Sequence, residues 1–557
     1  MVADRASRAN SHSSASRRPI EDEKHSSSSD MPPALTDSLN AAVEAKDYPS
    51  PFIRWAIVIA LLLGEFLIAL DLTIVATAIP RITDEFKSIA DVGWYGSAFF
   101  LTFAAYQSAW GKVYKYFDMR NAFFASVVVF VIGSIICAAA PKSAALIIGR
   151  AITGVGAAGV TNGVYTIIAC IVPPRQVAMY FAFVGVVFSI ASVAGPLLGG
   201  IFTEKLTWRW CFWINLPVGA ASLGVVLFFF RTPKLMKAAE ATLKEKLLQM
   251  DLQGTVLIVA SLVCYMLAMQ WGGISLPWNS ATIIGLLVGW IVLGICFVID
   301  QWLLGDRAQI VTRIIKDRTV AGLSAFILFL NATTFLLIYY LPIYFQAIDD
   351  LSPSASGVRS LPLILAMSIA LLASSALVSW IGYFHPLLLV GSVLLTVGAG
   401  LIFTLDIGSS TGEHIGYQIL VGAGNGISSQ IPIIASLAFA APEDIAVTTA
   451  LVLFFQLISG ALSVSLAQTL FTNTLLSKLP LYAPTVDPAV VIAVGASELR
   501  KAFAPDVLPG VLQAYMAGLK ASWEAGIVLA GLALLAALVP RWESIQNRPT
   551  SSGGTVA

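Results

Sequence analysis

Three ionisable side chains lie inside long apolar stretches of the sequence. Glu65 and Asp71 stand in "ALLLGEFLIALDLTIVATAIP", and Arg150 stands in "LIIGRAITGVG". A charged side chain costs at least a few kcal/mol in hydrocarbon, so a residue kept there usually has a partner or a function. The chemistry open to two carboxylates and a guanidinium is proton binding and ion pairing.

Asp71 and Arg150 are expected at similar depths in a membrane. The first apolar stretch should run outward and end near Ile79, and the fourth should run inward from about Ala144. With a helical rise of about 1.5 Å per residue, Asp71 lies roughly 12 Å and Arg150 roughly 9 Å below the same boundary. We therefore expect the two opposite charges to make contact. Such a pair could take part in proton transfer or only hold two helices in register.

Glu65 is expected roughly 21 Å below that boundary. The apolar stretches carry no cationic residue at its depth. Desolvation disfavours the charged form of an isolated carboxylate, so Glu65 could carry a proton. A neutral glutamic acid that is hydrogen-bonded to a neighbouring helix is an equally open interpretation.

The elements that must position these residues are membrane-spanning helices. The 557 residues are 57% hydrophobic and 12% charged, and their mean hydropathy is +0.82. A spanning helix needs about 20 mostly apolar residues. Stretches that meet this requirement are 55–79, 92–111, 121–140, 144–172, 178–202, 211–230, 252–271, 279–303, 320–346, 357–380, 385–405, 414–440, 445–472 and 521–540. The sequence thus predicts an all-α polytopic membrane protein with fourteen spans.

Charge and composition divide the chain into parts. The loops expected on one side hold most of the basic residues, including the linker "RTPKLMKAAEATLKEK". The positive-inside rule therefore places both termini in the cytosol. The expected parts are a disordered tail (1–50), a six-helix bundle (51–230), a basic linker (231–251), two inserted spans (252–303), a second linker (304–319), a second six-helix bundle (320–540) with an external loop (473–520), and a tail (541–557).

Several function classes are not expected. The net charge of +1 and the scattered basic residues argue against nucleic-acid binding. The five cysteines lie in apolar runs and indicate neither a disulfide framework nor a metal site, and two of the four histidines lie in the N-terminal tail. With no nucleophile or metal cluster in the spans, we expect no enzyme, no metal and no cofactor.

Glycines in two spans favour close helix packing. "GVGAAG" at 154–159 has the spacing G-x-G-x-x-G, but it follows "ALIIG" within an apolar run rather than a strand, which argues against dinucleotide binding. Small residues there let another helix approach. In "ASVAGPLLGG", Gly195 and Gly199 share one face with Ala191, while Pro196 and Gly200 complete a candidate hinge.

Amide side chains within the spans are candidates for a substrate path. An amide can also serve only to hydrogen-bond between helices. The candidates are Gln107, Asn162, Asn331, Gln346, Gln430 and Gln456.

Several of these motifs resemble those of the major facilitator superfamily, and within it the fungal fourteen-span drug:proton antiporters. "LDLTIVATAIP" resembles the first-span motif whose acidic residue is assigned to proton coupling, and "LIIGRAITGVGAA" resembles the fourth-span motif that contains the proton-transfer arginine. "AGPLLGG" resembles the antiporter motif of the fifth span, and "WRWCFWINLPVG" and "YYLPIYFQAI" resemble further signatures. "GKVYKYFDMR" differs, because Lys115 stands at the acidic position of the family's loop motif. The usual cytoplasmic latch is therefore in doubt.

The resemblance implies a proton-coupled exporter of small amphipathic organic compounds, such as drugs or a mycotoxin. It would be a monomer in the plasma membrane or a vacuolar or vesicle membrane, with the proton gradient as its energy source. Asp71, Arg150 and Glu65 would couple protons to transport. A carrier of another cargo, such as an iron chelate or an amino acid, and a non-transporting sensor are the alternatives.

Overall fold

The computed structural model describes residues 49–86, 92–230, 242–494 and 498–544. The tail expected to be disordered, 1–50, lies outside the described residues except for its last two. The linker 231–251 is described from Thr242 onward, and the tail 541–557 is described as far as Ser544.

The described residues are helical, and they contain isolated β-bridges but no strand. The long helices are α2 (Pro51–Phe86), α3 (Val92–Ala105), α5 (Met119–Ala138), α6 (Ser143–Ile171), α7 (Pro174–Lys205), α9 (Asn215–Phe229), α11 (Leu252–Trp271), α12 (Ala281–Leu304), α14 (Arg318–Ala347), α16 (Leu361–Ile381), α17 (His385–Phe403), α18 (Thr411–Ser428), α20 (Ile445–Tyr482) and α23 (Leu508–Ala536). The shorter helices are α4 (Gln107–Tyr116), α8 (Trp210–Trp213), α10 (Leu243–Leu248), η3 (Gly305–Arg307), α13 (Thr312–Ile315), α15 (Pro353–Arg359), α19 (Ile431–Phe439), η4 (Pro442–Asp444), α21 (Pro488–Ala493) and α22 (Leu499–Ala502).

The expected class of an all-α polytopic membrane protein is confirmed. Among the described residues, thirteen helices are long and apolar enough to cross a membrane. The expected span 92–111 is not among them because it is divided at Tyr106 into α3 and α4. The Tyr106 N–H still donates to the Thr102 carbonyl at 3.0 Å, and the Trp110 N–H donates to the Tyr106 carbonyl at 3.1 Å. The two helices therefore continue as one hydrogen-bonded span.

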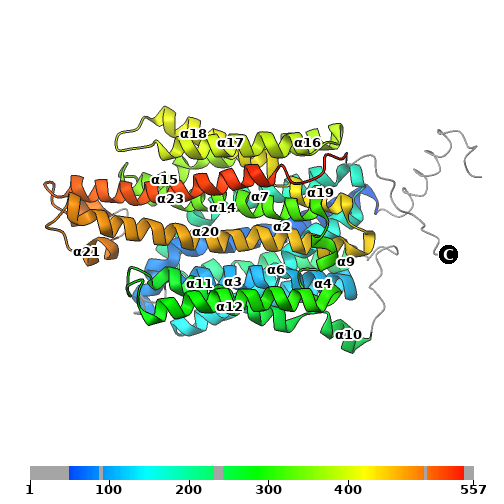
Figure 1. Ribbon diagram of the computed structural model, residues 1–557. Coiled ribbons are helices and arrows are strands. Elements are labelled where there is room, and N and C mark those ends of the chain that lie inside the picture. The colour runs from blue at the N-terminus through cyan, green and yellow to red at the C-terminus, as the bar shows by residue number, and fades with distance from the viewer. Residues whose placement is uncertain (1–48, 87–91, 231–241, 495–497, 545–557) are drawn as a thin grey trace, which may run out of the picture. The chain divides into compact units, whose positions relative to one another are not determined.

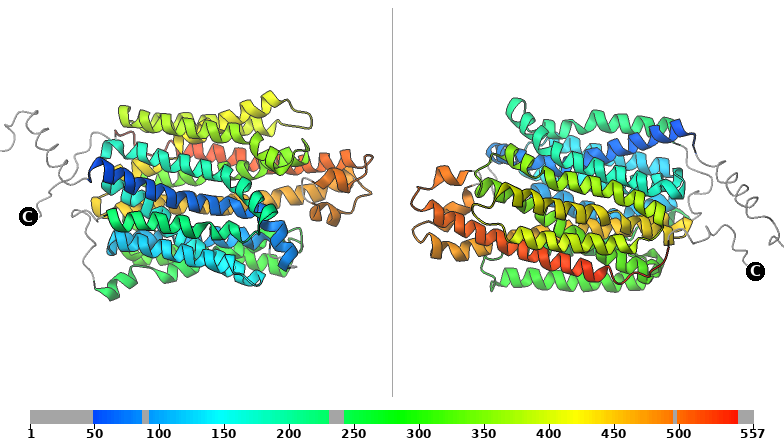
Figure 2. Two further views of the ribbon diagram at one scale, coloured as in Figure 1. Left: turned by 180° about the vertical axis from the view of Figure 1, so that it is seen from behind. Right: turned by 90° about the horizontal axis from the view of Figure 1, so that it is seen from above.

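The helices pack in three groups that follow the chain, and they run side by side (Figures 1 and 2). In the first group α2 packs against α7 and α9, and α6 packs against α3 and α5. In the last group α18 packs against α16 and α17, while α14, α20 and α23 pack together. Helices α11 and α12 pack on each other, and α11 also contacts α3 and α20. The first and last groups meet where α20 contacts α3 and α4, and where α16 contacts α7.

Two helices extend beyond their expected spans. Helix α20 continues to Tyr482 and α23 begins at Leu508, so both enter the segment 473–520 that we expected to be a loop. The same segment also contains the short helices α21 and α22. A hydropathy pattern marks only the apolar part of a helix, whereas the helix itself can continue into water.

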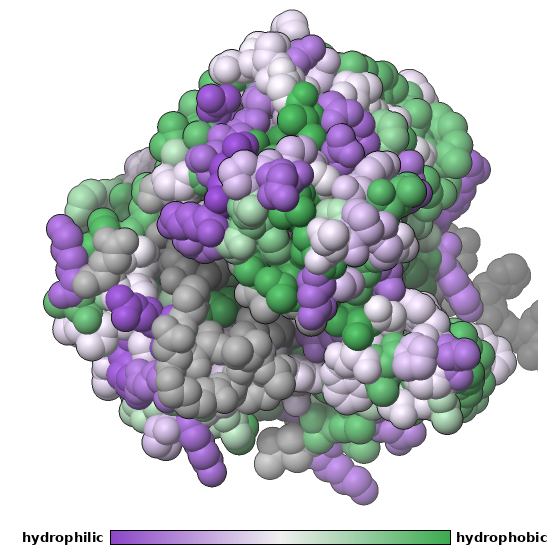
Figure 3. Space-filling view, turned by 90° about the vertical axis from the view of Figure 1, so that its left-hand side faces the viewer, coloured by the Kyte–Doolittle hydropathy of each residue, from purple (hydrophilic) through white to green (hydrophobic). Residues whose placement is uncertain are grey.

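The bundle has two ends. The α4 end contains α4, α10 and α19, and the α21 end contains α15 and α21 (Figure 1). Seen from the α21 end, hydrophilic residues are scattered among hydrophobic ones (Figure 3).

Candidate functional site

The structure places Asp71 of α2 and Arg150 of α6 in direct contact, as depth along the spans predicted. The Arg150 Nη1 group forms an ion pair with Asp71 Oδ2, and both side chains are buried, with at most 1% exposed. The Arg150 Nε–H donates to the backbone carbonyl of Tyr95 on α3 at 2.8 Å. One guanidinium thus joins three helices of the first bundle.

Aromatic rings flank the guanidinium. Its central carbon lies 4.5 Å from the centroid of the Phe99 ring and 5.9 Å from that of Phe212. The negative face of an aromatic ring attracts a cation, and the attraction grows when water is excluded. These rings hold Arg150 in place independently of its contact with Asp71.

Asn215 is a third member of the network around Asp71. Its Nδ2 group donates to Asp71 Oδ1 at 3.1 Å and to Ser134 Oγ of α5 at 3.1 Å. Asn215 is the first residue of α9, and Pro217 follows within the first helical turn. A proline is tolerated there because the N–H groups of that turn have no partner within the helix. The start of α9 is therefore fixed at the level of Asp71.

Glu65 lies in a separate network. It is buried, and the Thr161 hydroxyl of α6 donates to its Oε2 atom at 3.0 Å. No ion pair involves Glu65 among the described residues. This geometry matches both sequence interpretations, because a neutral acid bonded to a neighbouring helix can still exchange a proton.

The amide candidates for a substrate path do not form one cluster. Asn162 Nδ2 donates to the Gln107 backbone carbonyl at 3.3 Å, and both residues are fully buried. Gln430, in the break between α18 and α19, donates to the Tyr165 hydroxyl at 3.2 Å and so links the two bundles. The remaining contacts are local: Asn331 bonds within α14, Gln346 bonds the Ser356 hydroxyl, and the buried Gln456 Oε1 atom has no partner among the described residues.

The candidate hinge lies beside Asp71. Gly195 packs so closely on α2 that an added Cβ would overlap the Thr73 side chain, and the Thr73 hydroxyl donates to the Ala191 carbonyl at 3.4 Å. Gly200 has open space around it, whereas Gly199 is buried. Helix α7 continues through position 196 without a break. Gly195 is thus a position of close approach between α2 and α7.

The glycines of α6 serve helix packing. An added Cβ at Gly154 would overlap Phe99 and Thr102 of α3, and one at Gly156 would overlap the Phe130 backbone of α5. This geometry supports the interpretation of these glycines as a close-packed groove. It also brings α3 and α5 close to α6, where Arg150 contacts Tyr95.

An ion-pair cluster joins the bundles at the α4 end. Lys115 Nζ of α4 lies 2.7 Å from Asp444 Oδ1, and Arg313 Nη2 of α13 lies 2.6 Å from Asp444 Oδ2. One turn from Lys115, Gly111 packs against Ala450 of α20 so closely that an added Cβ would overlap it. The doubt about a latch at this loop therefore needs revision: an inter-bundle ion pair is present, with the basic residue on α4 and the acidic residue before α20.

The environment of the Asp444 carboxyl lowers its pKa. Burial on its own would raise its pKa, but hydrogen bonds and charges from Lys115 and Arg313 outweigh this effect and hold the pKa below its usual value. The carboxylate also stands immediately before the first turn of α20, where the helix dipole favours a negative charge.

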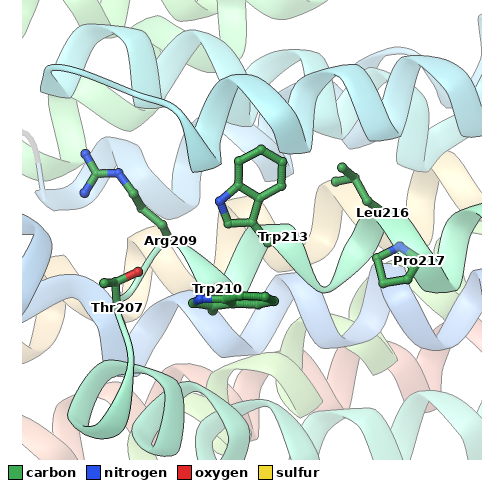
Figure 4. Close-up of a pocket in the computed structure, with 6 residues that line it drawn as sticks. All are labelled: Thr207, Arg209, Trp210, Trp213, Leu216 and Pro217. Carbon is green, nitrogen blue, oxygen red and sulfur yellow. The ribbon is translucent and has the colours of Figure 1, made fainter.

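A hollow on the surface lies beside α8 (Figure 4). Thr207, Arg209, Trp210, Trp213, Leu216 and Pro217 line it. Trp210 is 47% exposed here, whereas Asn215, in the same stretch of chain, is fully buried against Asp71. The stretch therefore has one face toward the hollow and one toward the Asp71 network.

Cysteines and metal-binding side chains add no further site. Within the described ranges, no group of three or more His, Cys, Asp or Glu residues could hold a metal ion. All five cysteines are free.

Sequence reasoning missed Asn215, although the signal needed to find it was present. Asn215 stands four residues after the start of the expected span 211–230, roughly 6 Å below the membrane boundary. The depth estimate that paired Asp71 with Arg150 would also have placed this amide near them. The flanking rings of Phe99 and Phe212 had no such signal, because aromatic residues are common throughout the spans.

Comparisons with known proteins agree with the resemblance of the motifs. The Major Facilitator Superfamily model matches residues 61–464. The chain is 44% identical over 515 residues to the MFS-type transporter grgE of Penicillium sp, covering 92% of this chain and 91% of that protein. It is 43% identical over 492 residues to the MFS-type efflux pump MFS1 of Trichophyton rubrum, covering 88% and 92%, and 42% identical over 501 residues to the efflux pump notK of an Aspergillus species, covering 90% and 89%.

Solved structures support the fold. The crystal structure of the human organic anion transporter MFSD10 (TETRAN) matches with a TM-score of 0.56 at 14% identity, covering 88% of this chain and all of that chain. An inward-facing bacterial homolog of the human lysosomal transporter Spinster matches with a TM-score of 0.55 at 15% identity, covering 88% and 98%.

Proposed function

We propose that this chain, which belongs to the Major Facilitator Superfamily, exports small amphipathic organic compounds in exchange for protons. The members of this family are membrane transporters rather than enzymes. Its relatives at 42–44% identity include proteins named as efflux pumps from filamentous fungi. The cargo class that fits them is a fungal secondary metabolite or a drug of similar character.

The observation that carries the proton coupling is the buried contact between Asp71 and Arg150. An acid and a guanidinium enclosed by Phe99 and Asn215 form a site whose charge changes by one when a proton binds. Asp71 can exchange this proton, whereas Arg150 stays charged at every physiological pH. Protonation of Asp71 breaks the ion pair and frees the guanidinium for other contacts.

The proposed cycle uses alternating access between the two bundles. Proton binding at Asp71 weakens its contact with Arg150 and changes how α2 packs on α6, and the close contact of Gly195 with α2 passes this change to α7. Contacts between the bundles at the α4 end, such as Lys115 with Asp444, hold that end closed. With the α4 end in the cytosol, this arrangement suits the state that has released cargo outside. Glu65 is a second proton site in this scheme.

The transporter would act as a monomer in the plasma membrane, with both termini in the cytosol and the proton gradient as its energy source. The basic linkers at the α4 end support this orientation.

The test is proton-driven transport in proteoliposomes. Purified protein is reconstituted, a pH gradient is imposed, and movement of the amphipathic dye rhodamine 6G and of protons is recorded with and without a protonophore. Asp71→Asn keeps an acceptor oxygen for Arg150, so we expect a folded protein that no longer responds to the gradient. Full gradient-driven transport by this variant would refute coupling at Asp71.

A further inference from the structure

The two oxygens of Asp71 have different kinds of partner. Oδ2 accepts from Arg150, and Oδ1 accepts from the Asn215 amide at 3.1 Å. An arginine can only donate hydrogen bonds, so it cannot accept the proton of a neutral carboxyl group. An asparagine side chain carries a donor group and an acceptor oxygen, so it can match either protonation state of its neighbour.

The surroundings of Asn215 suit such a change of role. Its Nδ2 group donates to both Asp71 and Ser134, while its Oδ1 atom is buried without a hydrogen-bond partner among the described residues. The Ser134 hydroxyl can donate as well as accept. Rotation of the amide by half a turn would let Asn215 Oδ1 accept from protonated Asp71 and from Ser134 at the same time.

We infer that Asn215 is a positioning residue of the proton site: its amide donates to ionised Asp71 and, when turned over, accepts the proton of neutral Asp71. This inference deepens the proposed function and rests on it for its role in transport. It assigns a role to the asparagine of "WRWCFWINLP", which the fold alone leaves unexplained.

Asn215 would thus accept the Asp71 proton after the ion pair between Asp71 and Arg150 breaks. When Asp71 gains its O–H bond, Arg150 keeps the Tyr95 carbonyl and the Phe99 ring. Neutral Asp71 stays bonded to α9 through Asn215. The proton therefore finds an acceptor on α9, and no buried O–H group is left unpaired.

Other titratable groups near the site lie on four helices. They are Tyr95 on α3, whose hydroxyl donates to Ser143, Cys137 on α5, Cys211 on α8 and, across the bundle interface on α14, Tyr339. Among the described residues, the direct side-chain partners of Asp71 are Arg150 and Asn215.

The test is pH-difference infrared spectroscopy of the purified full-length protein in lipid bilayers. The carboxyl band of Asp71 is assigned by its loss in Asp71→Asn, and the amide band of Asn215 by its loss in the isosteric Asn215→Leu. We expect the two bands of the wild type to titrate together. Asn215→Leu removes a charged hydrogen bond from the ionised carboxylate and a weaker, neutral hydrogen bond from the protonated form. The carboxyl midpoint should therefore rise by roughly one pH unit. Ser134→Ala, which leaves the bond between Asn215 and Asp71 intact, is the matched control and should shift the midpoint far less.

Two results would overturn the inference: an unchanged carboxyl midpoint in Asn215→Leu, or an amide band that does not change with pH. If Asn215→Leu does not fold, Asn215→Asp replaces it. Two adjacent carboxyl groups should then lose their protons in two separate steps. A single step at the wild-type pH would refute the role. The measurement needs neither cargo nor gradient, so its outcome is distinct from that of the transport assay with Asp71→Asn.

Discussion

Replacement of Arg150 alone should destabilise the protein more than replacement of Arg150 together with Asp71. In Arg150→Leu the buried Asp71 carboxylate loses its charge partner and keeps only the Asn215 amide. In Asp71→Asn/Arg150→Leu no charge remains at the site, and the new amide still provides an acceptor for Asn215.

The expected magnitudes follow from burial. Both members of the pair are at most 1% exposed, so solvent screening is negligible. Removal of one partner of a buried pair costs about 3–5 kcal/mol. In the double variant the remaining losses are the hydrogen bond to the Tyr95 carbonyl and the contact with Phe99, which together are worth about 1–2 kcal/mol. The second substitution should therefore restore about 2–3 kcal/mol of the free energy of unfolding.

The assay is equilibrium unfolding in mixed micelles, with tryptophan fluorescence as the signal. The matched control is the surface pair of Lys501 and Glu498, whose side chains are 77% and 55% exposed. Replacement of either residue of this pair, or of both together, should change the free energy of unfolding by less than about 1 kcal/mol. If Arg150→Leu and the double variant lost equal free energy, Asp71 and Arg150 would not depend on each other, and the reasoning would fail.

Three further variants test other parts of the mechanism. Lys115→Met should make a cysteine placed at the α4 end about ten times more reactive toward a water-soluble maleimide, because one charged hydrogen bond between the bundles is lost. Lys115→Arg is the control. Equal cysteine reactivity in Lys115→Met and Lys115→Arg would contradict the latch. Gly195→Val should abolish transport of the fluorescent dye at normal expression, because α2 leaves no room for a side chain at this position. Gly200 has open space around it, so Gly200→Ala should leave transport unchanged. Similar transport by the two variants would show that Gly195 is not part of the hinge. Glu65→Gln keeps an acceptor for Thr161 and should retain its stability while it lowers the number of protons moved per cargo; an unchanged ratio would leave Asp71 as the sole carrier.

The sequence predicted those features that depend on one-dimensional position. The fold class follows from the length of the apolar runs, and the contact between Asp71 and Arg150 follows from depth along straight helices of fixed rise. Both quantities are insensitive to how the helices are rotated about their axes. The division of the second span at Tyr106 left no trace in hydropathy, because the hydrogen bonds across it continue.

Features that depend on helix rotation or on distant partners were not predictable. Gln107 and Gln430 are both amides in apolar spans, yet the Gln107 amide has no hydrogen-bond partner among the described residues, whereas Gln430 reaches across to Tyr165 of the other bundle. Lys115 differed from the family pattern, and the sequence contained no measure that would pair it with Asp444, 329 positions away. Only the packing of α4 on α20 reveals this ion pair between the two bundles.

The ion pairs of Asp444 also bear on which groups respond to a change of pH. The pKa of Asp444 is lowered by Lys115 and Arg313, so its ionised form stabilises the folded protein at every pH above about 4 and is lost only as the pH falls through its lowered pKa. Proton concentrations that a cell encounters therefore leave this ion pair intact. In the proposed mechanism a change of pH therefore acts elsewhere, on the buried acids Asp71 and Glu65. In the proposed cycle the α4 end opens because the packing of α2 on α6 and α7 changes beneath it, and Asp444 stays ionised throughout.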